Sequence, residues 1–190
     1  SGSIRIDNVD VRRYDLKALR EKIGFIPQKA LLFTGSINEN IRYGKHNAVQ
    51  TEVEHSAKVA QAYDFITEKP KQFEEMIEEG GGNVSGGQRQ RLSIARAVVR
   101  KPDIYIFDEP TKGVDVGAKQ DIFHLINEIA KQGHGVIYAS CENSELLSLT
   151  DRMYVMYNGT VMAELKTDKT TEDEIMYYSV GGTDDKNRNQ

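Results

Sequence analysis

The stretch from residue 83 to residue 111 constrains the fold of this chain most. It reads NVSGGQRQRLSIARAVVRKPDIYIFDEPT. Ser85 is a good helix N-cap, because its hydroxyl can accept a hydrogen bond from a backbone N–H one turn further on. Apolar residues then recur at helical spacing, which predicts a helix over residues 88–99. Pro102 ends that helix, because proline lacks the N–H that a helix interior needs.

A short apolar run follows the predicted helix and ends in two acids. Residues 104–107 form an unbroken run that is typical of a strand buried on both faces of a parallel sheet. Asp108 and Glu109 come directly after it, at the carboxyl end of the strand, where open α/β sheets bind their ligands. Gly86 and Gly87 leave the start of the helix bare, and a bare helix N-terminus is an anion site.

The order of helix, strand and acidic pair points to nucleoside triphosphate hydrolysis. Asp108 suits a Mg²⁺ ion that is held through one carboxylate and the phosphates of the substrate. Glu109 can orient or deprotonate a water molecule. Each piece taken singly also fits an ordinary capped helix and a core strand followed by two solvated acids. Taken together in this order, the pieces favour hydrolysis.

Two segments carry a resemblance to a known family. Residues 85–92 (SGGQRQRL) and residues 104–111 (IYIFDEPT) resemble the signature motif and the Walker B motif of the ATP-binding cassette (ABC) ATPases. The resemblance implies an α/β fold, a P-loop NTPase-like core with a mostly parallel sheet and a helical subdomain. It implies that Asp108 serves Mg²⁺ and that Glu109 is the general base. It also implies contacts to the γ-phosphate of an ATP held by the opposite subunit, made by Ser85, Gly86, Gly87 and Gln88.

The same resemblance extends to two loops. The segment GFIPQKALLFTGSINENI resembles the Q-loop, which implies that Gln28 reaches the Mg²⁺ and the attacking water. A lone glutamine in a loop is more often simply solvated or bonded to backbone. The apolar residues 30–33 are a candidate surface for docking a membrane domain, or simply core. Asp115 stands where the family has its D-loop aspartate, a residue that faces the other subunit.

The switch position of the family is altered in this chain. Where ABC ATPases usually have a histidine that contacts the γ-phosphate, the sequence has Ser140, Cys141 and Glu142, with Cys141 at the histidine position. A thiol is a weak donor and cannot become an imidazolium. The switch is therefore either missing or carried by Ser140 or Glu142. We interpret Cys141 as a small buried residue rather than a reactive one.

The resemblance also divides between two branches of the family. The segment LFTGSINENIRYG resembles exporters, whereas GVDVGAK and DRMYVMYNGTV resemble sugar-importer ATPases. The phosphate-cradling motif GxxxxGK[ST] occurs nowhere in the 190 residues. We therefore expect a cassette that lacks its N-terminal P-loop portion. We also expect the chain alone to bind ATP poorly and to be inactive, because that loop supplies most of the binding to the β- and γ-phosphates.

Composition narrows the class of protein. The hydrophobic content of 38% and the charged content of 28% are ordinary for a soluble globular protein. The net charge of −4 gives no global reason to expect a nucleic-acid partner. The single cysteine rules out an internal disulfide framework and fits a reducing compartment. No window approaches 18 apolar residues, so we expect no transmembrane helix.

Local signals give a first map of the chain. We expect a hairpin around Asp7 and Asn8, a short helix after Asp15, and a second hairpin at Asn158 and Gly159. Capping boxes are predicted at Ser36 with Glu39 and at Thr51 with Glu54. We assign residues 1–180 to a partial ABC ATPase domain, with residues 37–100 as helical subdomain and signature helix, residues 101–165 as Walker B, D-loop and switch strands, and residues 181–190 as a disordered tail.

These observations predict part of an ABC transporter that binds and hydrolyses ATP with Mg²⁺. The expected partners are a second nucleotide-binding domain, in a homo- or heterodimer, and a transmembrane domain, which would hold the chain at the cytoplasmic face of a membrane. One alternative is a non-hydrolysing regulatory or docking half-cassette that donates only the signature motif. The intact pair of Asp108 and Glu109 argues against it. The transporter-like segments and the acidic net charge argue against a third option, a soluble ABC protein of DNA repair or translation.

Overall fold

The computed structural model describes residues 2–183 and contains two compact units, residues 1–139 and residues 140–190. Each unit is described by itself. The assignment of residues 1–180 to one partial ABC ATPase domain stays a prediction. Residues 184–190, which make up most of the predicted disordered tail, lie outside the described residues. No helix within residues 2–183 is both long enough and apolar enough to cross a bilayer.

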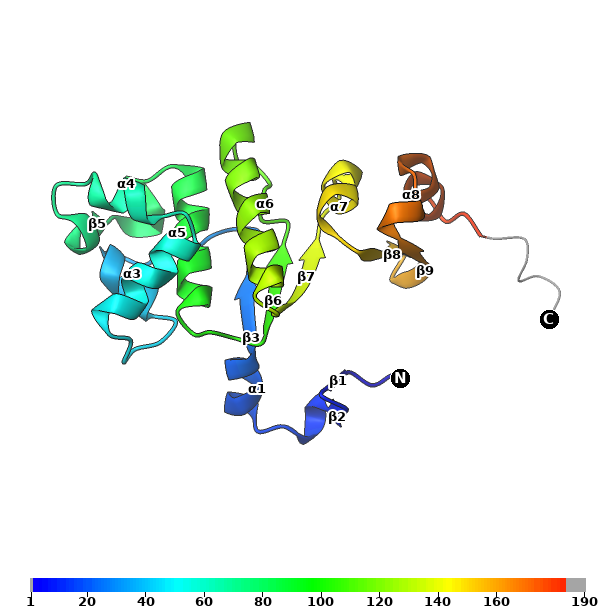
Figure 1. Ribbon diagram of the computed structural model, residues 1–190, viewed down its shortest axis with the longest axis horizontal. Helices are drawn as coiled ribbons and strands as arrows, with labels where there is room; N and C mark the ends of the chain where they lie inside the picture. The colour runs from blue at the N-terminus through cyan, green and yellow to red at the C-terminus, as the bar shows by residue number, and fades with distance from the viewer. Residues whose placement is uncertain (1, 184–190) are drawn as a thin grey trace. The chain divides into compact units, whose positions relative to one another are not determined.

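The first unit is built on a parallel sheet of three strands (Figure 1). In spatial order the strands are β3 (Ile23–Ile26), β6 (Ile104–Asp108) and β7 (Gly135–Ala139). The register places Ile26 opposite Phe107, and Asp108 opposite Ala139. All three strands therefore end at the same edge of the sheet, and the predicted α/β architecture with a parallel sheet is confirmed.

Helices pack beside and against this sheet. The helical part of the unit contains α2 (Ile37–Arg42), α3 (Gln50–Val59), α4 (Tyr63–Thr67) and α5 (Gly86–Val98). Both α2 and α3 contact α5, and α5 contacts β3, so α5 lies between the other helices of this group and the sheet (Figure 1). The group also holds β4 (Gly35–Ser36) paired with β5 (Met76–Ile77), and the short 3-10 helices η2 (Gln72–Glu74) and η3 (Glu79–Gly81). The long helix α6 (Val116–Lys131) precedes β7.

The two faces of the sheet differ in burial. Ile26, Tyr105 and Phe107 are buried on one face, where α5 contacts β3 and α6 contacts β7. On the other face, Phe25 and Ile137 are 55% and 56% exposed. In β6 itself, Ile104 and Ile106 on that second face are only half-buried, so the prediction that residues 104–107 are buried on both faces is wrong. An apolar run shows that a strand can be buried, but its burial depends on whether other elements pack against both of its faces.

The chain enters this unit through a small hairpin. Strands β1 (Arg5–Ile6) and β2 (Val9–Asp10) pair antiparallel around Asp7 and Asn8, whose φ angles are 50° and 62°. Two consecutive residues with positive φ make the turn that suits a two-residue hairpin, so this prediction is confirmed. A 3-10 helix, η1 (Val11–Arg13), leads to α1 (Leu16–Lys22). The Asp15 carboxylate caps α1 by accepting from backbone N–H groups of its first turn.

Capping chemistry sets the starts of α2 and α3. The Ser36 hydroxyl accepts from the Glu39 N–H at 3.1 Å, and the Glu39 carboxylate accepts from the Ser36 N–H at 2.7 Å, so the predicted capping box is confirmed. Helix α3 instead begins one residue before Thr51, because the Glu52 carboxylate accepts from the Val49 N–H at 3.2 Å. The predicted capping box of Thr51 with Glu54 is therefore wrong.

The second unit is a hairpin covered by helices. Strands β8 (Arg152–Tyr157) and β9 (Thr160–Lys166) pair antiparallel across Asn158 and Gly159, as predicted. Its other elements are α7 (Asn143–Leu149), the 3-10 helix η4 (Thr167–Lys169) and α8 (Glu172–Ser179). Its core is formed by Met153 and Val155 of β8 with Ile175 and Tyr178 of α8.

A buried asparagine ties the loop after β3 to α2. The side chain of Asn40 is only 2% exposed. Its amide nitrogen donates to the carbonyl oxygens of Phe33 and Ser36 at 2.9 and 3.1 Å, and its amide oxygen accepts from the Phe33 N–H at 2.9 Å. These bonds satisfy backbone groups that a loop would otherwise leave unpaired.

Arg96 of α5 extends the same network. Its guanidinium donates to the Asn40 amide oxygen at 2.9 Å, to the Asn40 carbonyl at 2.9 Å and to the Leu31 carbonyl at 2.8 Å. It also lies 4.9 Å from the centre of the Phe33 ring, a cation–π distance. Burial lowers the pKa of the Arg96 guanidinium. The loop that follows Gln28 is therefore held to α5 and α2 together.

We predict that Asn40→Ala lowers the free energy of unfolding by about 2 to 3 kcal/mol, because it leaves buried backbone groups and the Arg96 guanidinium short of a partner. Urea denaturation of the chain measures this change. The exposed Asn47 offers a control, and Asn47→Ala should change the stability by less than about 0.5 kcal/mol. Equal effects of the two substitutions would contradict the structural role given to Asn40.

Candidate functional site

Parallel pairing brings two of the predicted site residues to one edge of the sheet. Ile26 and Phe107 are opposite each other on β3 and β6. Gln28 follows Ile26 by two residues, Asp108 follows Phe107 by one, and both polar residues are exposed. Strand alternation puts the Asp108 side chain on the same sheet face as Ile106. The amide and the carboxylate therefore share the carboxyl edge of the sheet, where ligands of α/β folds bind.

Glu109 sits on an unusual backbone just beyond β6. Its φ angle is 42°, in the left-handed region, and its N–H donates to the Ala139 carbonyl at 2.8 Å. A left-handed non-glycine residue costs free energy, and such residues gather at functional sites. The Glu109 carboxylate lies 2.8 Å from the ammonium of Lys112. Lys112 was not among the predicted site residues, because a spacing of three residues indicates an ion pair in a helix and residues 110–113 form a turn.

The signature end of α5 begins with a reciprocal cap. The Ser85 hydroxyl accepts from the Gln88 N–H at 3.2 Å, and the Gln88 side-chain oxygen accepts from the Ser85 N–H at 3.2 Å. The predicted N-cap is confirmed, and α5 starts at Gly86, two residues earlier than predicted. The cap satisfies two of the backbone donors that every helix start leaves open.

The two glycines of the signature segment differ in surroundings. Gly87 is buried, and a Cβ atom at this position would lie 3.1 Å from the Cβ of Ala118 on α6. A Cβ at the half-buried Gly86 would meet the Gly113 carbonyl at an ordinary 3.7 Å. Gly87 thus lets the starts of α5 and α6 approach closely, a packing role that its place in the motif did not indicate.

Asp115 belongs to the same cluster. Its carboxylate caps α6 by accepting from the Ala118 N–H at 3.0 Å, so the helix begins at Val116. A Cβ at Gly87 would lie 3.8 Å from the other Asp115 carboxylate oxygen. The structure therefore brings Asp115 beside Gly87 of the signature segment of the same chain.

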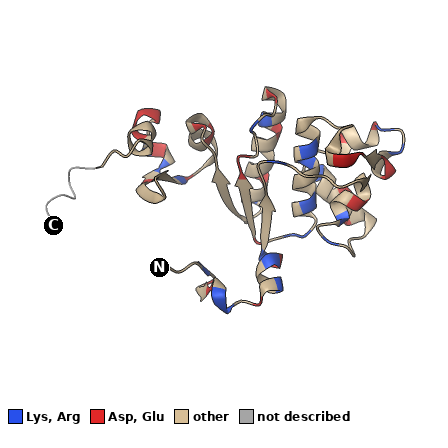
Figure 2. Ribbon diagram, turned by 180° about the vertical axis from the view of Figure 1, so that it is seen from behind, with Lys and Arg blue, Asp and Glu red and all other residues tan. Residues whose placement is uncertain are grey.

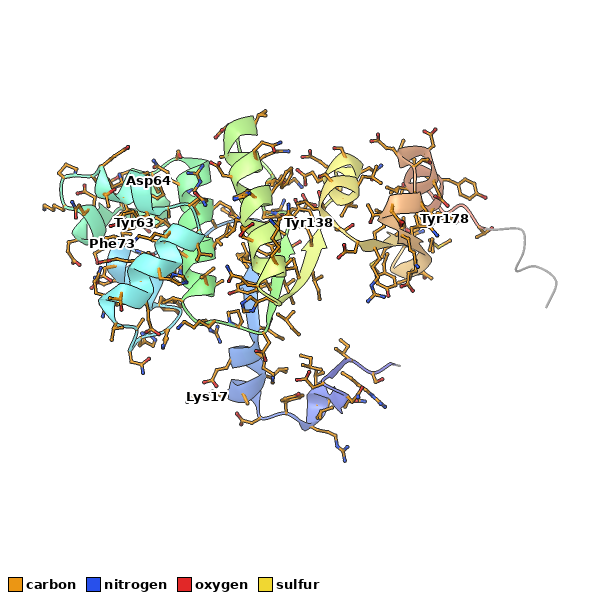
Figure 3. All side chains as sticks on the ribbon, viewed as in Figure 1. Lys17, Tyr63, Asp64, Phe73, Tyr138 and Tyr178 are labelled. Carbon is orange, nitrogen blue, oxygen red and sulfur yellow. The ribbon has the colours of Figure 1, made fainter. Side chains whose placement is uncertain are left out.

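A tight turn joins this cluster to the sheet edge. The Lys112 N–H donates to the Glu109 carbonyl at 3.2 Å, and the Val114 N–H donates to the Thr111 carbonyl at 3.1 Å. Thr111 is 2% exposed, and its hydroxyl lies 3.3 Å from the hydroxyl of Tyr138. Tyr138 belongs to β7 (Figure 3). The turn is thus anchored on the sheet as well as along its backbone.

Basic residues recur along α5 (Figure 2). The Arg89 guanidinium donates to the carbonyls of Gly81 and Val84 at 3.0 and 2.7 Å, which fixes the loop before the helix. Arg91 forms an ion pair with Asp121 of α6. These arginines have protein partners that orient α5. The helical periodicity of the sequence predicts the helix but not these partners.

The switch region lies at the start of the second unit. The Ser140 hydroxyl donates to the Glu145 carboxylate at 2.7 Å and accepts from the Glu142 N–H at 3.0 Å. Glu145 is only 4% exposed. Cys141 is exposed, so its interpretation as a small buried residue is wrong. The reason is that β7 ends at Ala139 and Cys141 falls in the bend beyond it.

The candidate magnesium donors are the Asp108 carboxylate and the Gln28 amide. Oxygen donors of this kind suit Mg²⁺, which commonly binds through one or two carboxylates, water and substrate phosphates. Within residues 2–183 no group of three or more His, Cys, Asp or Glu side chains is placed to hold a metal ion. The residues present fit a cation that arrives with a phosphate ligand of its own.

Comparisons with known proteins agree on one family. A sequence model described as "ABC transporter" matches residues 1–112. The chain is 35% identical over 179 residues to the Multidrug resistance protein homolog 65 of Drosophila melanogaster, covering 94% of this chain and 14% of that protein. It is also 35% identical over 178 residues to the Putative multidrug export ATP-binding/permease protein YgaD of Bacillus subtilis, covering 94% of this chain and 30% of that protein.

A solved structure supports the fold at the same level. A bacterial Atm1-family ABC exporter with ATP bound superposes with a TM-score of 0.83 and 29% sequence identity, over 97% of this chain and 33% of that one. The predicted ABC ATPase core, α/β with a parallel sheet, is therefore confirmed. The chain spans about a third or less of the length of each of these three proteins.

We predict that Gly87→Val lowers the free energy of unfolding by about 1 to 3 kcal/mol, because the new side chain overpacks the contact with Ala118. Gly86→Val is the matched control, since its Cβ meets only ordinary contacts, and it should cost at least about 1 kcal/mol less. Thermal or urea denaturation compares the two variants. If both cost the same, the glycine at position 87 does not serve the packing of α5 on α6.

Proposed function

Because the chain belongs to the ABC transporter family, we propose that it is the signature-bearing part of a nucleotide-binding domain that binds and hydrolyses ATP. One observation carries this proposal. The parallel, in-register pairing of β3 with β6 brings Gln28 to the same sheet edge as Asp108 and Glu109. These are the three side chains that hydrolysis would need for the cation, the water and the proton.

Each of the three side chains has a distinct proposed role at that edge. Asp108 binds Mg²⁺ through its exposed carboxylate, and Gln28 orients the cation and the attacking water. Glu109 accepts the proton of that water as general base. Bound Mg²⁺ and ATP supply the electrophilic phosphorus and the charge that offsets the phosphate oxygens. The protein contributes position and electrostatics, which are the main contributions to phosphoryl transfer.

The signature face acts on a second nucleotide in our proposal. Ser85, Gly86, Gly87 and Gln88 contact the γ-phosphate of an ATP that a second nucleotide-binding domain holds, in a homo- or heterodimer. Asp115 faces the same partner. The proximity of Gly87 to Asp115 supports this assignment, because one surface can then meet one partner. The start of α5 also offers the positive end of the helix dipole to an anion.

Hydrolysis in this proposal drives transport through a separate transmembrane domain, which holds the chain at the cytoplasmic face of the membrane. The exposed side chains of Leu31 and Phe33, 58% and 46% exposed, support a docking surface directly after Gln28. The names of the two relatives, which refer to multidrug resistance and multidrug export, favour export. The GVDVGAK segment keeps import as the competing direction.

For the switch we propose Ser140 rather than Cys141. The Ser140 hydroxyl donates its one proton to the buried Glu145 carboxylate, which fixes the position of its oxygen. Contact with a phosphate oxygen then requires the hydroxyl to turn that proton from Glu145 to the phosphate. The exposed Cys141 thiol is a weak donor. The Glu142 backbone N–H donates to the Ser140 hydroxyl. The Glu142 carboxylate does not suit the switch role, because its negative charge repels a phosphate.

The alternative is a docking half-cassette that donates the signature face and never hydrolyses ATP itself. The sequence contains no GxxxxGK[ST] motif, which favours this alternative for the 190 residues alone. The defined geometry around Glu109 favours hydrolysis, since a docking element needs no base on a left-handed backbone.

We predict that Glu109→Gln in the complete protein lowers ATP turnover by about 100-fold or more, because the amide cannot accept the proton of the attacking water. ATP binding should persist, because the amide keeps the size of the carboxylate. Steady-state phosphate release and nucleotide binding measure the two effects, with Glu172→Gln, an exposed acid of the second unit, as control. Unchanged turnover in Glu109→Gln would favour the docking alternative.

We predict that the 190 residues alone bind Mg·ATP weakly, with a dissociation constant of roughly 100 μM or more, because they lack a phosphate-cradling loop. Equilibrium binding would be measured with and without an intact cassette that carries this loop. Stimulated turnover in the mixture would support a signature face that acts on a partner. Tight binding and turnover by the 190 residues alone would contradict our account of how the phosphates are held.

A further inference from the structure

We infer that Lys112 is a positioning residue for the Glu109 carboxylate. This inference rests on the function proposed above, in which Glu109 is the general base. The Lys112 ammonium lies 2.8 Å from one carboxylate oxygen of Glu109. The carboxylate is 24% exposed and the lysine side chain 56% exposed. The pair lies at the end of β6, directly beyond the proposed Mg²⁺ ligand.

Three contacts hold the backbone between Glu109 and Lys112 in place. Glu109 adopts a φ of 42° and donates its N–H to the Ala139 carbonyl of β7. The Lys112 N–H returns to the Glu109 carbonyl at 3.2 Å, which closes a turn. Thr111, between them, is buried, and its hydroxyl lies 3.3 Å from the Tyr138 hydroxyl. The two charged side chains therefore start from Cα positions that the fold determines, and their ion pair is a property of the turn.

An ion pair on this turn restricts the rotamers of the Glu109 side chain. A general base works only when its oxygen is within hydrogen-bond reach of the proton that it removes. A flexible glutamate at the rim of a sheet reaches that place for only part of the time, and small displacements lower the rate strongly. A carboxylate offers two oxygens with about four acceptor sites. The lysine can therefore hold one oxygen while the base function uses the other.

If Lys112 served only the stability of the fold, its substitution would lower the free energy of unfolding and would not act on kcat through Glu109. Ion pairs as exposed as this one contribute little to stability. Loss of the Lys112 charge should therefore leave folding almost unchanged, while it releases the carboxylate. The same chain contains a matched pair on α6, where the Lys131 ammonium lies 2.8 Å from the Glu128 carboxylate, also three residues apart. Lys131 is not in the proposed catalytic or binding machinery.

The test uses the complete protein with Lys112→Met, Lys112→Arg and Lys131→Met, and steady-state ATP hydrolysis as the readout. Lys112→Met should lower kcat by about tenfold while KM for ATP stays within about twofold, because the lost interaction orients the base without binding substrate. Lys112→Arg should restore most of kcat, since a guanidinium also pairs with a carboxylate. Lys131→Met should match the unsubstituted protein.

Two further variants, Glu109→Gln and Glu109→Gln combined with Lys112→Met, separate this inference from the proposed function. Glu109→Gln abolishes turnover if Glu109 is the base, and Lys112→Met added to it should then cause no further loss in single-turnover rates, because the lysine acts through the carboxylate. If Glu109→Gln is inactive and Lys112→Met keeps kcat within twofold, the inference is wrong and the proposed function stands. If Glu109→Gln is fully active, the proposed function itself fails. A tenfold loss that arginine does not rescue would also overturn the positioning role.

Discussion

The parallel pairing of β6 with β3 on one side and β7 on the other is the constraint on which the first unit depends. Parallel strands cannot be joined by tight turns, so long segments must cross between them. The crossover from β3 to β6 contains the whole helical group, and the crossover from β6 to β7 contains α6. Because the strands are parallel, every connection that follows a strand begins at the same edge of the sheet. Gln28 and Asp108 meet there as a consequence of topology, far apart as they are in the sequence.

A second constraint acts where the helices begin. Gly87 on α5 and Ala118 on α6 approach so closely that a Cβ at position 87 would require Ala118 to shift by a few tenths of an ångström. Asp115 caps α6 at the same place, and the turn from Glu109 ends just before it. The proposed base, the capping aspartate and the signature glycines are thus mechanically adjacent. A shift of α5 against α6 would change the positions of all these residues, which suits a site completed by a second domain.

Features set by local rules could be predicted from the sequence, and features set by tertiary surroundings could not. Ser85 caps α5 as expected because a serine cap needs only the next turn of its own chain. Helix α3 was misplaced because Glu52 and Glu54 both offered an acid at capping distance, and sequence spacing does not choose between them. The exposure of Ile137 depends on what covers the sheet. The Lys112 ion pair depends on the left-handed backbone of Glu109, which no residue type announces.

The acceptors around Arg96 have a consequence for how the loop after Gln28 is held. They are carbonyl and amide oxygens of Leu31 and Asn40, which carry no net charge and do not titrate in the physiological range. Dissolved ions therefore have little to screen, and a change of acidity has no carboxylate to neutralise. The ion pair of Arg91 with Asp121, by contrast, weakens as salt rises. Salt and pH therefore have little effect on the hydrogen bonds that join α5 to the loop after Gln28. Salt does weaken the Arg91–Asp121 ion pair, which is part of what joins α5 to α6.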